Sequence, residues 1–399
     1  MGIGHQGIEM FRTPGFRFAT YYGAFYLTLG AFLPYFPKWL EGRDLSAEWI
    51  GWIVAAGLAG RTLVSPLGAR WADNARRNRD PILLFALAAT LVFALHFPVS
   101  SPWILLVLSF LSGAMLFGQI PVIDAFALRQ ARDGLFVFGP VRAIGSVMFI
   151  ISNFAAGALI DWRGSETILV CIVAGSVAIS AAAARLPAGE RAPHPPAQEA
   201  DITALRRLLA GPFGLALAAS ALIQGGHGFY YAFSAVAWSA QGYADLTIGA
   251  LWASGVAVEI VFLWVSGRGW LGRLSPAALL IIGGAGSILR WGLTALAPPL
   301  WGLFALQCLH ALSFAATYLG FLRYAAQSVP DRFAATGQAI NSALAGGVVM
   351  AIASAVSGYF FARLGTTGFA IMILPAAAGL VAALLLSRNS ALPRADKID

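Results

Sequence analysis

The sequence has few charged residues, and this scarcity excludes most classes of soluble protein. Only 11% of its 399 residues are Asp, Glu, Lys or Arg, whereas 59% are hydrophobic. A soluble globular domain has about 25% charged residues. In a bilayer the backbone must satisfy its own hydrogen bonds, so spanning segments are helices or closed barrels, and apolar runs of roughly 20 residues favour helices. The sequence therefore predicts an all-α membrane protein.

Other absences exclude several kinds of chemistry. The two cysteines, Cys171 and Cys308, fall inside apolar stretches and lack metal-ligand spacing. The lysines are Lys38 and Lys397, so a glycine-rich phosphate loop with its lysine is missing and ATP-driven transport is not expected. The sequence also lacks a nucleophile elbow, a zinc-binding His-Glu motif and an acidic cluster for phosphoryl transfer. We therefore expect neither an enzyme nor a metal or other cofactor.

Apolar stretches recur along the whole chain, separated by polar, proline-rich or glycine-rich segments. Between the sixth and the seventh stretch, residues 187–211 form a proline-containing polar linker with room for one short amphipathic helix. We therefore expect twelve transmembrane helices in two sets of six. They span residues 16–37, 47–70, 81–97, 101–126, 139–160, 165–186, 212–238, 245–267, 275–297, 299–327, 333–361 and 366–387.

The distribution of Lys and Arg predicts the orientation in the membrane. Residues 1–17 are polar and glycine-rich and do not resemble a cleavable leader, so we expect the first helix to be retained. With a cytoplasmic amino terminus, most basic residues fall in cytoplasmic segments, as the positive-inside rule requires. Both termini are then cytoplasmic, and the net charge of +8 requires no nucleic-acid partner. The outer loops hold Lys38, Arg43, Arg163 and Arg363.

Ionisable residues also occur inside the apolar stretches, where they are costly and indicate function. The arginines of this set outnumber its carboxylates by one, and a bound anion would balance the excess positive charge. The alternative is that arginines pair with the carboxylate of their own half, while the extra arginine contacts backbone carbonyls or water. The residues are Arg61, Asp124 and Arg142 in the first half, and His227, Glu259, Arg290 and His310 in the second.

One face of the expected helix 212–238 carries hydrogen-bonding and aromatic groups at intervals of three and four residues. An aromatic ligand would stack on a tyrosine of this face while its polar end reaches His227 or an arginine. Alternatively, the tyrosines only pack between helices, with their hydroxyls satisfied by neighbours. The residues of this face are Gln224, His227, Tyr230, Tyr231 and Ser234.

Glu259 is the preferred candidate for carrying a proton. A carboxylate is costly at low dielectric, so protonation is favoured there, and a nearby arginine such as Arg290 favours the ionised form again. His227 and His310 are alternatives, because imidazole changes its protonation near neutral pH.

The pattern of six helices, a cytoplasmic linker and six more helices resembles the major facilitator superfamily. That resemblance implies two six-helix bundles, at residues 1–186 and 212–399, which rock about a midplane site. The superfamily signature after the second helix is partly matched in residues 69–79. There the resemblance implies gating contacts for Asp73 and Arg76, and Arg61 is a third gating candidate.

Individual motifs are similar to those of the phenylpropionate permease family, which transports 3-phenylpropionic acid in bacteria. The similarity extends from about residue 20 to residue 385 and is strongest in the second half, where the Gln-Gly-Gly-His run is followed by two tyrosines. The resemblance implies proton-coupled uptake of an aromatic acid. The matching residues include Gly30 to Pro34, Arg61, Gln224 to His227, Tyr230, Tyr231, Glu259, Arg290 and His310.

That family is related to the lactose permease group of sugar:proton symporters. By resemblance to those sugar permeases, Asp124 and Arg142 bind substrate, and Arg290 and His310 match an arginine and a histidine of their coupling machinery. The chain departs from the sugar permeases on either side of His310, where Gln307 and Ser313 replace a lysine and a proton-accepting glutamate. Proton coupling is therefore expected at Glu259.

The sequence thus predicts a monomeric secondary transporter of the inner membrane that imports a small aromatic carboxylate, such as 3-phenylpropionate, with protons. Its partners are an organic anion, protons and the lipid bilayer. The expected substrate-binding residues are Asp124, Arg142, Gln224, His227, Tyr230, Tyr231, Arg290 and His310, with Glu259 and His310 for proton coupling. Symport of a sugar or nucleoside and efflux of a small organic compound are alternative functions, and a receptor-like role is a more distant one.

Overall fold

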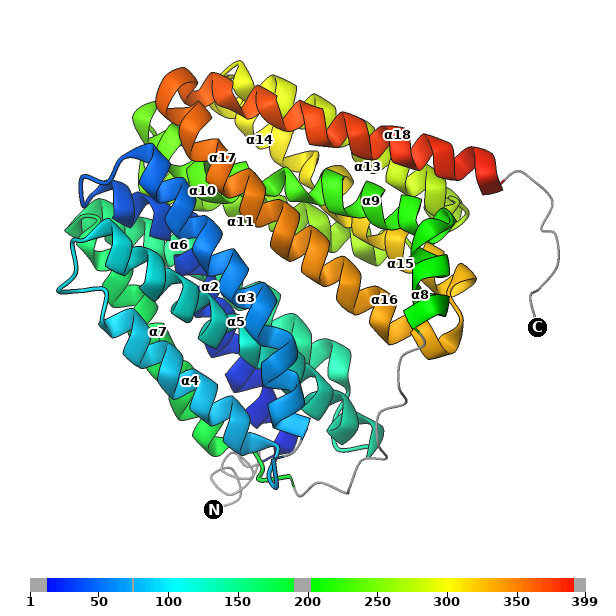
Figure 1. The fold of residues 1–399 in the computed structure, drawn as a ribbon. Helices are drawn as coiled ribbons and strands as arrows, with labels where there is room; N and C mark the ends of the chain where they lie inside the picture. Colours follow the sequence, from blue (N-terminus) through cyan, green and yellow to red (C-terminus); the bar gives the residue numbers. More distant parts are fainter. Residues whose placement is uncertain (1–12, 74, 190–201, 391–399) are drawn as a thin grey trace. The chain divides into compact units, whose positions relative to one another are not determined.

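The structure is a computed structural model that describes residues 13–73, 75–189 and 202–390. Within these ranges the chain consists of helices joined by short connections (Figure 1). It divides into two compact units, each described by itself. Unit 1 comprises Met1–Pro195 and Tyr231–Ala253, and unit 2 comprises Pro196–Tyr230 and Ser254–Asp399.

Unit 1 contains six long helices together with parts of α10 and α11. The first, α2, begins where the Thr13 side chain accepts a hydrogen bond from the backbone N–H of Phe16 and Pro14 occupies the first turn. The connection after α6 turns at Gly164, whose φ of +85° favours glycine. The helices are α2 (Pro14–Glu41), α3 (Ala47–Asp73), α4 (Arg79–Ala94), α5 (Pro102–Arg132), α6 (Phe138–Arg163), α7 (Glu166–Arg185), α10 (His227–Ala240) and α11 (Asp245–Val265).

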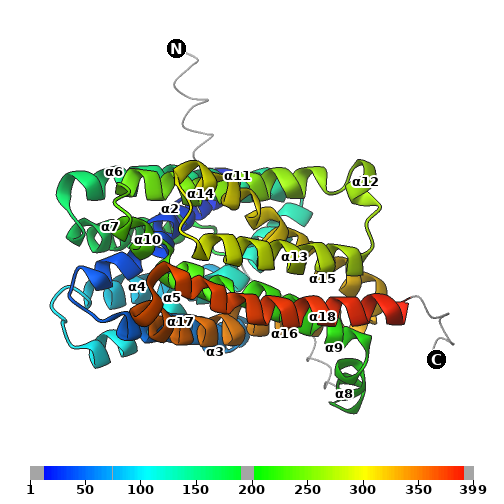
Figure 2. The same cartoon turned by 90° about the horizontal axis from the view of Figure 1, so that it is seen from above.

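Unit 2 is built around α9, which packs against α13, α15 and α18. Figures 1 and 2 show α9, α13 and α18 running side by side. Phe213, Ile223, Leu280 and Phe321 belong to the buried cluster between these helices. The further elements are α8 (Ile202–Ala210), α9 (Pro212–Gly225), α12 (Gly269–Gly272), α13 (Pro276–Ala295), α14 (Leu300–Cys308), η1 (Ala311–Ala316), α15 (Thr317–Ser328), α16 (Asp331–Ala343), η2 (Leu344–Val348), α17 (Val349–Leu364), η3 (Gly365–Met372) and α18 (Ile373–Ser390).

The expected apolar stretches lie in helical segments, but some are interrupted. Gly226 separates α9 from α10, and the π-helices η1 and η2 interrupt two later stretches. The short helix expected in the linker is α8. Seven helical segments of the described chain are long and apolar enough to cross a membrane. The expected number of twelve spans and the division at residues 187–211 stay predictions.

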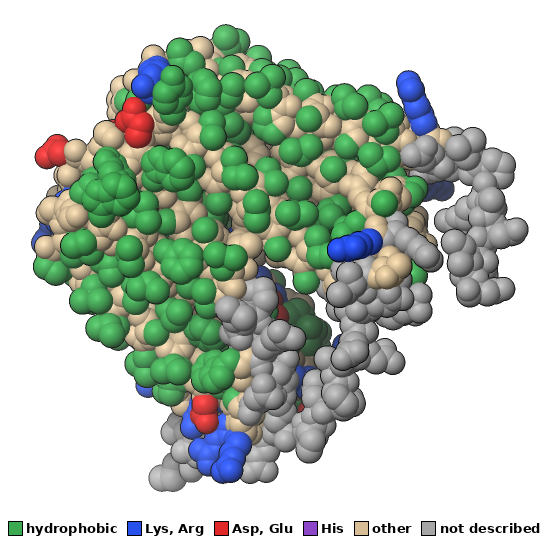
Figure 3. Space-filling model, in the orientation of Figure 1, with side chains coloured by type: hydrophobic (Ala, Val, Ile, Leu, Met, Phe, Trp, Pro, Cys, Tyr) green, Lys and Arg blue, Asp and Glu red, His purple; other side chains and the backbone are tan. Residues whose placement is uncertain are grey.

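Large hydrophobic side chains cover much of the outer surface, as a protein solvated by lipid requires. Leu84, Leu91, Trp103 and Val137 are more than half exposed. Figure 3 shows such side chains spread over the face that it draws, where Lys and Arg side chains are few. A monomeric soluble protein rarely exposes a contiguous apolar patch larger than a few hundred Å², so this surface supports the membrane assignment.

Glycines bring α3 and α5 into close contact in unit 1. A Cβ atom added to Gly113 would lie 2.1 Å from the backbone oxygen of Gly57, and one added to Gly60 would lie 1.9 Å from that of Phe110. The Ser109 hydroxyl also donates to the backbone oxygen of Ile53 at 2.7 Å. Small residues that allow backbones to approach are typical of helix pairs in membranes.

Gly113→Ala is therefore expected to destabilise unit 1, because the obstacle is backbone that cannot rotate away. Overpacking costs about 1–3 kcal/mol, so we expect a lower midpoint of thermal unfolding in detergent. Gly139→Ala is the matched control, since a Cβ atom there meets nothing within 4 Å. Equal midpoints for the two variants would contradict the packing argument.

Candidate functional site

A buried arginine forms the centre of a polar cluster in unit 2. Arg290 lies on α13 and is only 1% exposed. Four neutral acceptors lie within hydrogen-bonding distance of its guanidinium. The acceptors are His310 Nδ1 at 2.8 Å, His227 Nε2 at 3.1 Å, Ser313 Oγ at 3.1 Å and Gln307 Oε1 at 3.2 Å.

These contacts determine the tautomer of both histidines. Arginine has no acceptor atom, so the imidazole nitrogens that face Arg290 accept and carry no proton. His227 then keeps its proton on Nδ1 and donates it to the Gln224 backbone oxygen at 2.9 Å. His310 keeps its proton on Nε2, which lies 3.4 Å from Glu259 Oε2. Both imidazoles are therefore neutral in this arrangement.

His310 connects the arginine to the carboxylate of the cluster. One ring nitrogen accepts from Arg290, and the opposite nitrogen points to Glu259, which lies on α11. The Glu259 side chain is 22% exposed and that of His310 is 9% exposed. Of the three linked side chains, Arg290, His310 and Glu259, the Glu259 carboxylate is the most accessible. Protons therefore reach it more readily than they reach the guanidinium.

Aromatic rings surround the guanidinium. Its central carbon lies 4.7 Å from the ring centroid of Tyr230 and 4.8 Å from that of Trp291. Phe314 stacks on the His310 ring, with centroids 5.3 Å apart. The Tyr230 hydroxyl donates to Gln307 Oε1 at 3.2 Å. The cluster thus combines a positive charge with aromatic surface, which suits a ligand that has an anionic end and a ring.

Irregular backbone positions the two histidines. His227 is the first residue of α10, directly after the break at Gly226, and His310 directly precedes the π-helix η1. A Cβ atom at position 226 would lie 2.9 Å from Trp291 Nε1, so glycine lets the chain pass close to that ring. Short π-helical segments often occur at functional sites.

A second polar group lies in unit 1, on α2, α5 and α6. The Tyr22 hydroxyl donates to Asp124 Oδ1 at 2.6 Å, and Arg142 Nε lies 3.7 Å from the same oxygen. Arg142 also bonds the Tyr26 hydroxyl and lies over the Tyr22 and Tyr26 rings. The Asp124 and Arg142 side chains are 32% and 29% exposed. They form an ion pair that solvent or a ligand reaches.

The remaining candidates lie elsewhere in the two units. In unit 1, Arg61 lies 4.8 Å from the centroid of the Phe117 ring, and Tyr231 packs against Trp252 with ring centroids 5.6 Å apart. In unit 2, the Gln224 side chain donates to Ser220 at 3.0 Å. Arg76 is exposed in the turn after α3, whereas the Asp73 side chain lies outside what the structure describes.

Several residues of these groups were not among the predicted site residues. Gln307, a predicted neighbour of His310, and Ser313 stand where the sugar permeases differ, and here both accept hydrogen bonds from Arg290. Their spacing of three residues on either side of His310 was the available signal. Tyr22 and Tyr26, four residues apart on α2, were not singled out at all. Across the described residues, no group of three or more His, Cys, Asp or Glu side chains is placed to hold a metal ion.

Comparison with known proteins identifies relatives over most of the chain. The model of the MFS_1 like family matches residues 16–371. The probable 3-phenylpropionic acid transporter of Escherichia coli K12 is 30% identical over 89% of this chain and 93% of its own length. The maltose permease of Geobacillus stearothermophilus is 26% identical over 87% of each chain.

A solved structure has the same fold. The crystal structure of the nucleoside transporter NupG superposes with a TM-score of 0.80 over 95% of this chain and 99% of its own, at 14% sequence identity. At that identity the likeness concerns the fold alone.

Proposed function

The chain belongs to the MFS_1 like family and is a multi-pass membrane transporter, and we propose that it imports a small aromatic carboxylate together with protons. The observation that carries this proposal is the buried Arg290, which bonds neutral acceptors, lies between aromatic rings and is linked through His310 to Glu259. The similarity to the probable 3-phenylpropionic acid transporter supports the substrate class.

The carboxylate of the substrate is proposed to bind Arg290. A hydrogen bond between a guanidinium and a carboxylate is roughly twice as strong as one between neutral groups. Since the described bonds of Arg290 go to imidazole, hydroxyl and amide acceptors, a carboxylate would displace one or two of them at a net gain. Ser313 and Gln307 then remain available to position the guanidinium.

The ring of the substrate is proposed to pack near Tyr230 and Trp291. Both rings already lie within 5 Å of the Arg290 guanidinium, so an aryl group attached to the bound carboxylate by a short linker reaches them. Aromatic pairs add roughly 0.5–1.5 kcal/mol beyond the burial of apolar area. This contribution favours aryl acids over aliphatic acids of similar size.

Charge balance supplies the coupling between substrate and proton. The set of Arg290, Glu259 and two neutral histidines is neutral when Glu259 is ionised. Protonation of Glu259 leaves one positive charge, and an incoming carboxylate restores neutrality. Since net charge is unfavourable in an apolar interior, the empty deprotonated state and the state with both ligands are preferred. Proton and anion therefore raise each other's affinity, as linkage requires.

Four further predictions from the sequence are part of this proposal. They are twelve membrane spans, inner-membrane location with both termini in the cytoplasm, a monomer, and gating by Arg61, Asp73 and Arg76. Asp124 and Arg142 of unit 1 are also proposed to bind substrate.

A second candidate is symport of a sugar or nucleoside. The accessible ion pair of Asp124 and Arg142, with the hydroxyls of Tyr22 and Tyr26, offers donors and acceptors that suit a polyol. The similarity to a maltose permease favours this candidate as well. Counterflow in proteoliposomes with 3-phenylpropionate, maltose and a nucleoside as competitors separates the two functions: inhibition by the sugar or nucleoside alone would exclude the aryl carboxylate.

Glu259→Gln should abolish uptake against a gradient while counterflow at equal pH persists. Glutamine resembles the protonated carboxyl, so the variant binds the anion but has no proton to release. The measurement is accumulation of labelled 3-phenylpropionate in proteoliposomes with and without an imposed pH gradient. The control is Asp133→Asn, which neutralises an exposed carboxylate. Full gradient-driven accumulation by Glu259→Gln would exclude it as the proton carrier.

Arg290→Lys should weaken substrate binding even though the charge is kept. Lysine lacks the planar fork of donors, and hydrogen bonds to charged groups contribute about 1.5–3 kcal/mol. We therefore expect the half-saturating concentration in counterflow to rise roughly tenfold to a hundredfold. Arg268→Lys on an exposed turn is the control. An unchanged half-saturating concentration for Arg290→Lys would place the carboxylate elsewhere.

Arg142→Ala should abolish uptake and leave the protein folded, because the partly exposed Asp124 that loses its partner still receives the Tyr22 hydrogen bond. Uptake is measured beside the thermal unfolding midpoint in detergent. Arg163→Ala is the matched control, because Arg163 lies outside both polar groups. Normal uptake kinetics in Arg142→Ala would remove this residue from the substrate site.

A further inference from the structure

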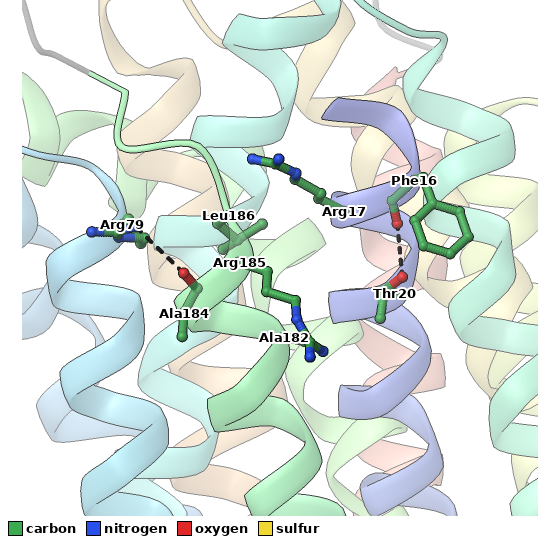
Figure 4. A pocket seen from close by; sticks show the side chains of 8 residues that line it. All are labelled: Phe16, Arg17, Thr20, Arg79, Ala182, Ala184, Arg185 and Leu186. Carbon is green, nitrogen blue, oxygen red and sulfur yellow. Dashed lines mark hydrogen bonds between the residues drawn. The ribbon is translucent and has the colours of Figure 1, made fainter. Parts of the chain in front are cut away.

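A basic cavity lies at one end of unit 1, apart from both polar groups described above. It has a volume of about 420 Å³ and opens between the start of α2, the start of α4 and the end of α7. Figure 4 shows Arg17 extending from α2 toward α7 and Arg185 extending from α7 toward α2. The lining also includes Phe16, Thr20, Arg79 and Leu186.

The cavity carries more positive than negative charge. Arg17, Arg79 and Arg185 each bring a guanidinium group to the lining. Of the described carboxylates, Asp80 lies 3.9 Å from Arg79 Nε, and its side chain is 54% exposed. Solvent weakens an ion pair of this kind. A bound anion would offset the excess positive charge of the lining.

A hydrogen bond holds the Arg79 side chain at the edge of the cavity. One terminal nitrogen donates to the backbone oxygen of Ala184 at 3.3 Å, which holds the side chain beside the end of α7. Its Nε atom has almost no accessible surface, so an anion in the cavity would contact terminal nitrogens of the guanidiniums instead. A phosphate oxygen is a charged acceptor and forms the stronger kind of bond with such N–H groups.

The surface beside the cavity suits acyl chains. On α4, Leu84 and Leu87 are 55% and 51% exposed, and on α7, Val170 and Val177 are 51% and 52% exposed. These two helices pack against each other. In Figure 3 hydrophobic side chains cover this part of unit 1, and basic side chains gather at its lower edge. Arginines at the end of a lipid-facing surface lie where phosphate groups of a bilayer occur.

We propose that this cavity binds the phosphate group of an anionic phospholipid, with Arg17, Arg79 and Arg185 as its ligands. The cavity lies on the side where α2 begins, which the sequence predicts to be cytoplasmic. Basic residues on that side are attracted to anionic lipids. The apolar surface distinguishes a lipid from free phosphate, since an inorganic ion would make no use of it.

The test is lipid retention by the full chain in native mass spectrometry, with phosphatidylglycerol and phosphatidylcholine offered in equal amounts. The wild type should retain phosphatidylglycerol preferentially. Arg17→Gln and Arg185→Gln should each reduce that preference about fivefold, since each basic residue near an anionic surface contributes on this scale. Arg79→Lys keeps the charge but loses the planar fork of donors, so a reduced preference there indicates that the guanidinium hydrogen-bonds the phosphate.

Arg388→Gln, at the exposed end of α18, is the matched control and should retain phosphatidylglycerol like the wild type. Thermal unfolding midpoints establish that each variant is folded. Equal retention of the two lipids by the wild type would overturn the proposal, as would an equal loss in Arg388→Gln. Stabilisation by inorganic phosphate without any preference for phosphatidylglycerol would assign the cavity to a free ion instead.

Discussion

The contact between Arg290 and His310 is the interaction on which the rest of the cluster depends. A guanidinium that is 1% exposed requires acceptors on several sides. Since arginine only donates, it determines which nitrogen of each neighbouring imidazole carries the proton. That choice directs the Nε2–H of His310 toward Glu259. A single buried cation thereby orients two histidines and connects an accessible carboxylate to the interior of unit 2.

The backbone around this contact departs from a regular helix, and a nearby side chain supplies a hydrogen bond to the irregular segment. The π-helix η1 follows His310 directly and loosens the usual bonding of the turn. The hydroxyl of Thr317 donates to the backbone oxygen of Ser313 at 3.1 Å, and the backbone oxygen of Leu312 lies 3.5 Å away as an alternative acceptor. In lipid a freed carbonyl must find such a partner. The threonine thus stabilises the irregular segment that carries His310 and Ser313.

The sequence was sufficient to predict which apolar stretches are helical and to single out most residues of the Arg290 cluster. Long apolar runs predict membrane helices wherever they occur. Ionisable residues within them, such as Glu259 and Arg290, are rare and are therefore recognised as site candidates. Sequence spacing also makes Gln307, His310 and Ser313 neighbours.

The details of the site depend on tertiary packing that spacing does not report. Arg290 and His227 are 63 residues apart, so their contact follows from tertiary packing within unit 2. The break at Gly226 was not expected, although consecutive glycines mark the place. Nothing in the sequence distinguishes the π-helix η1 from ordinary helix. The tyrosines of α2 could not be predicted as site residues, because an aromatic residue in an apolar run usually only packs against its neighbours.

The two polar groups differ in how their arginine is balanced, and this difference assigns them different parts of the proposed transport cycle. Arg142 lies 3.7 Å from Asp124, and both side chains are about one-third exposed, so water screens the pair whatever its occupancy. Arg290 is buried, and the His310 imidazole contacts both Arg290 and Glu259. A change of charge at Glu259 therefore has a larger electrostatic effect on Arg290 than an equal change at Asp124 would have on Arg142. Under the proposed mechanism, proton linkage belongs to unit 2, while the tyrosine hydroxyls and ion pair of unit 1 contribute to the choice of substrate.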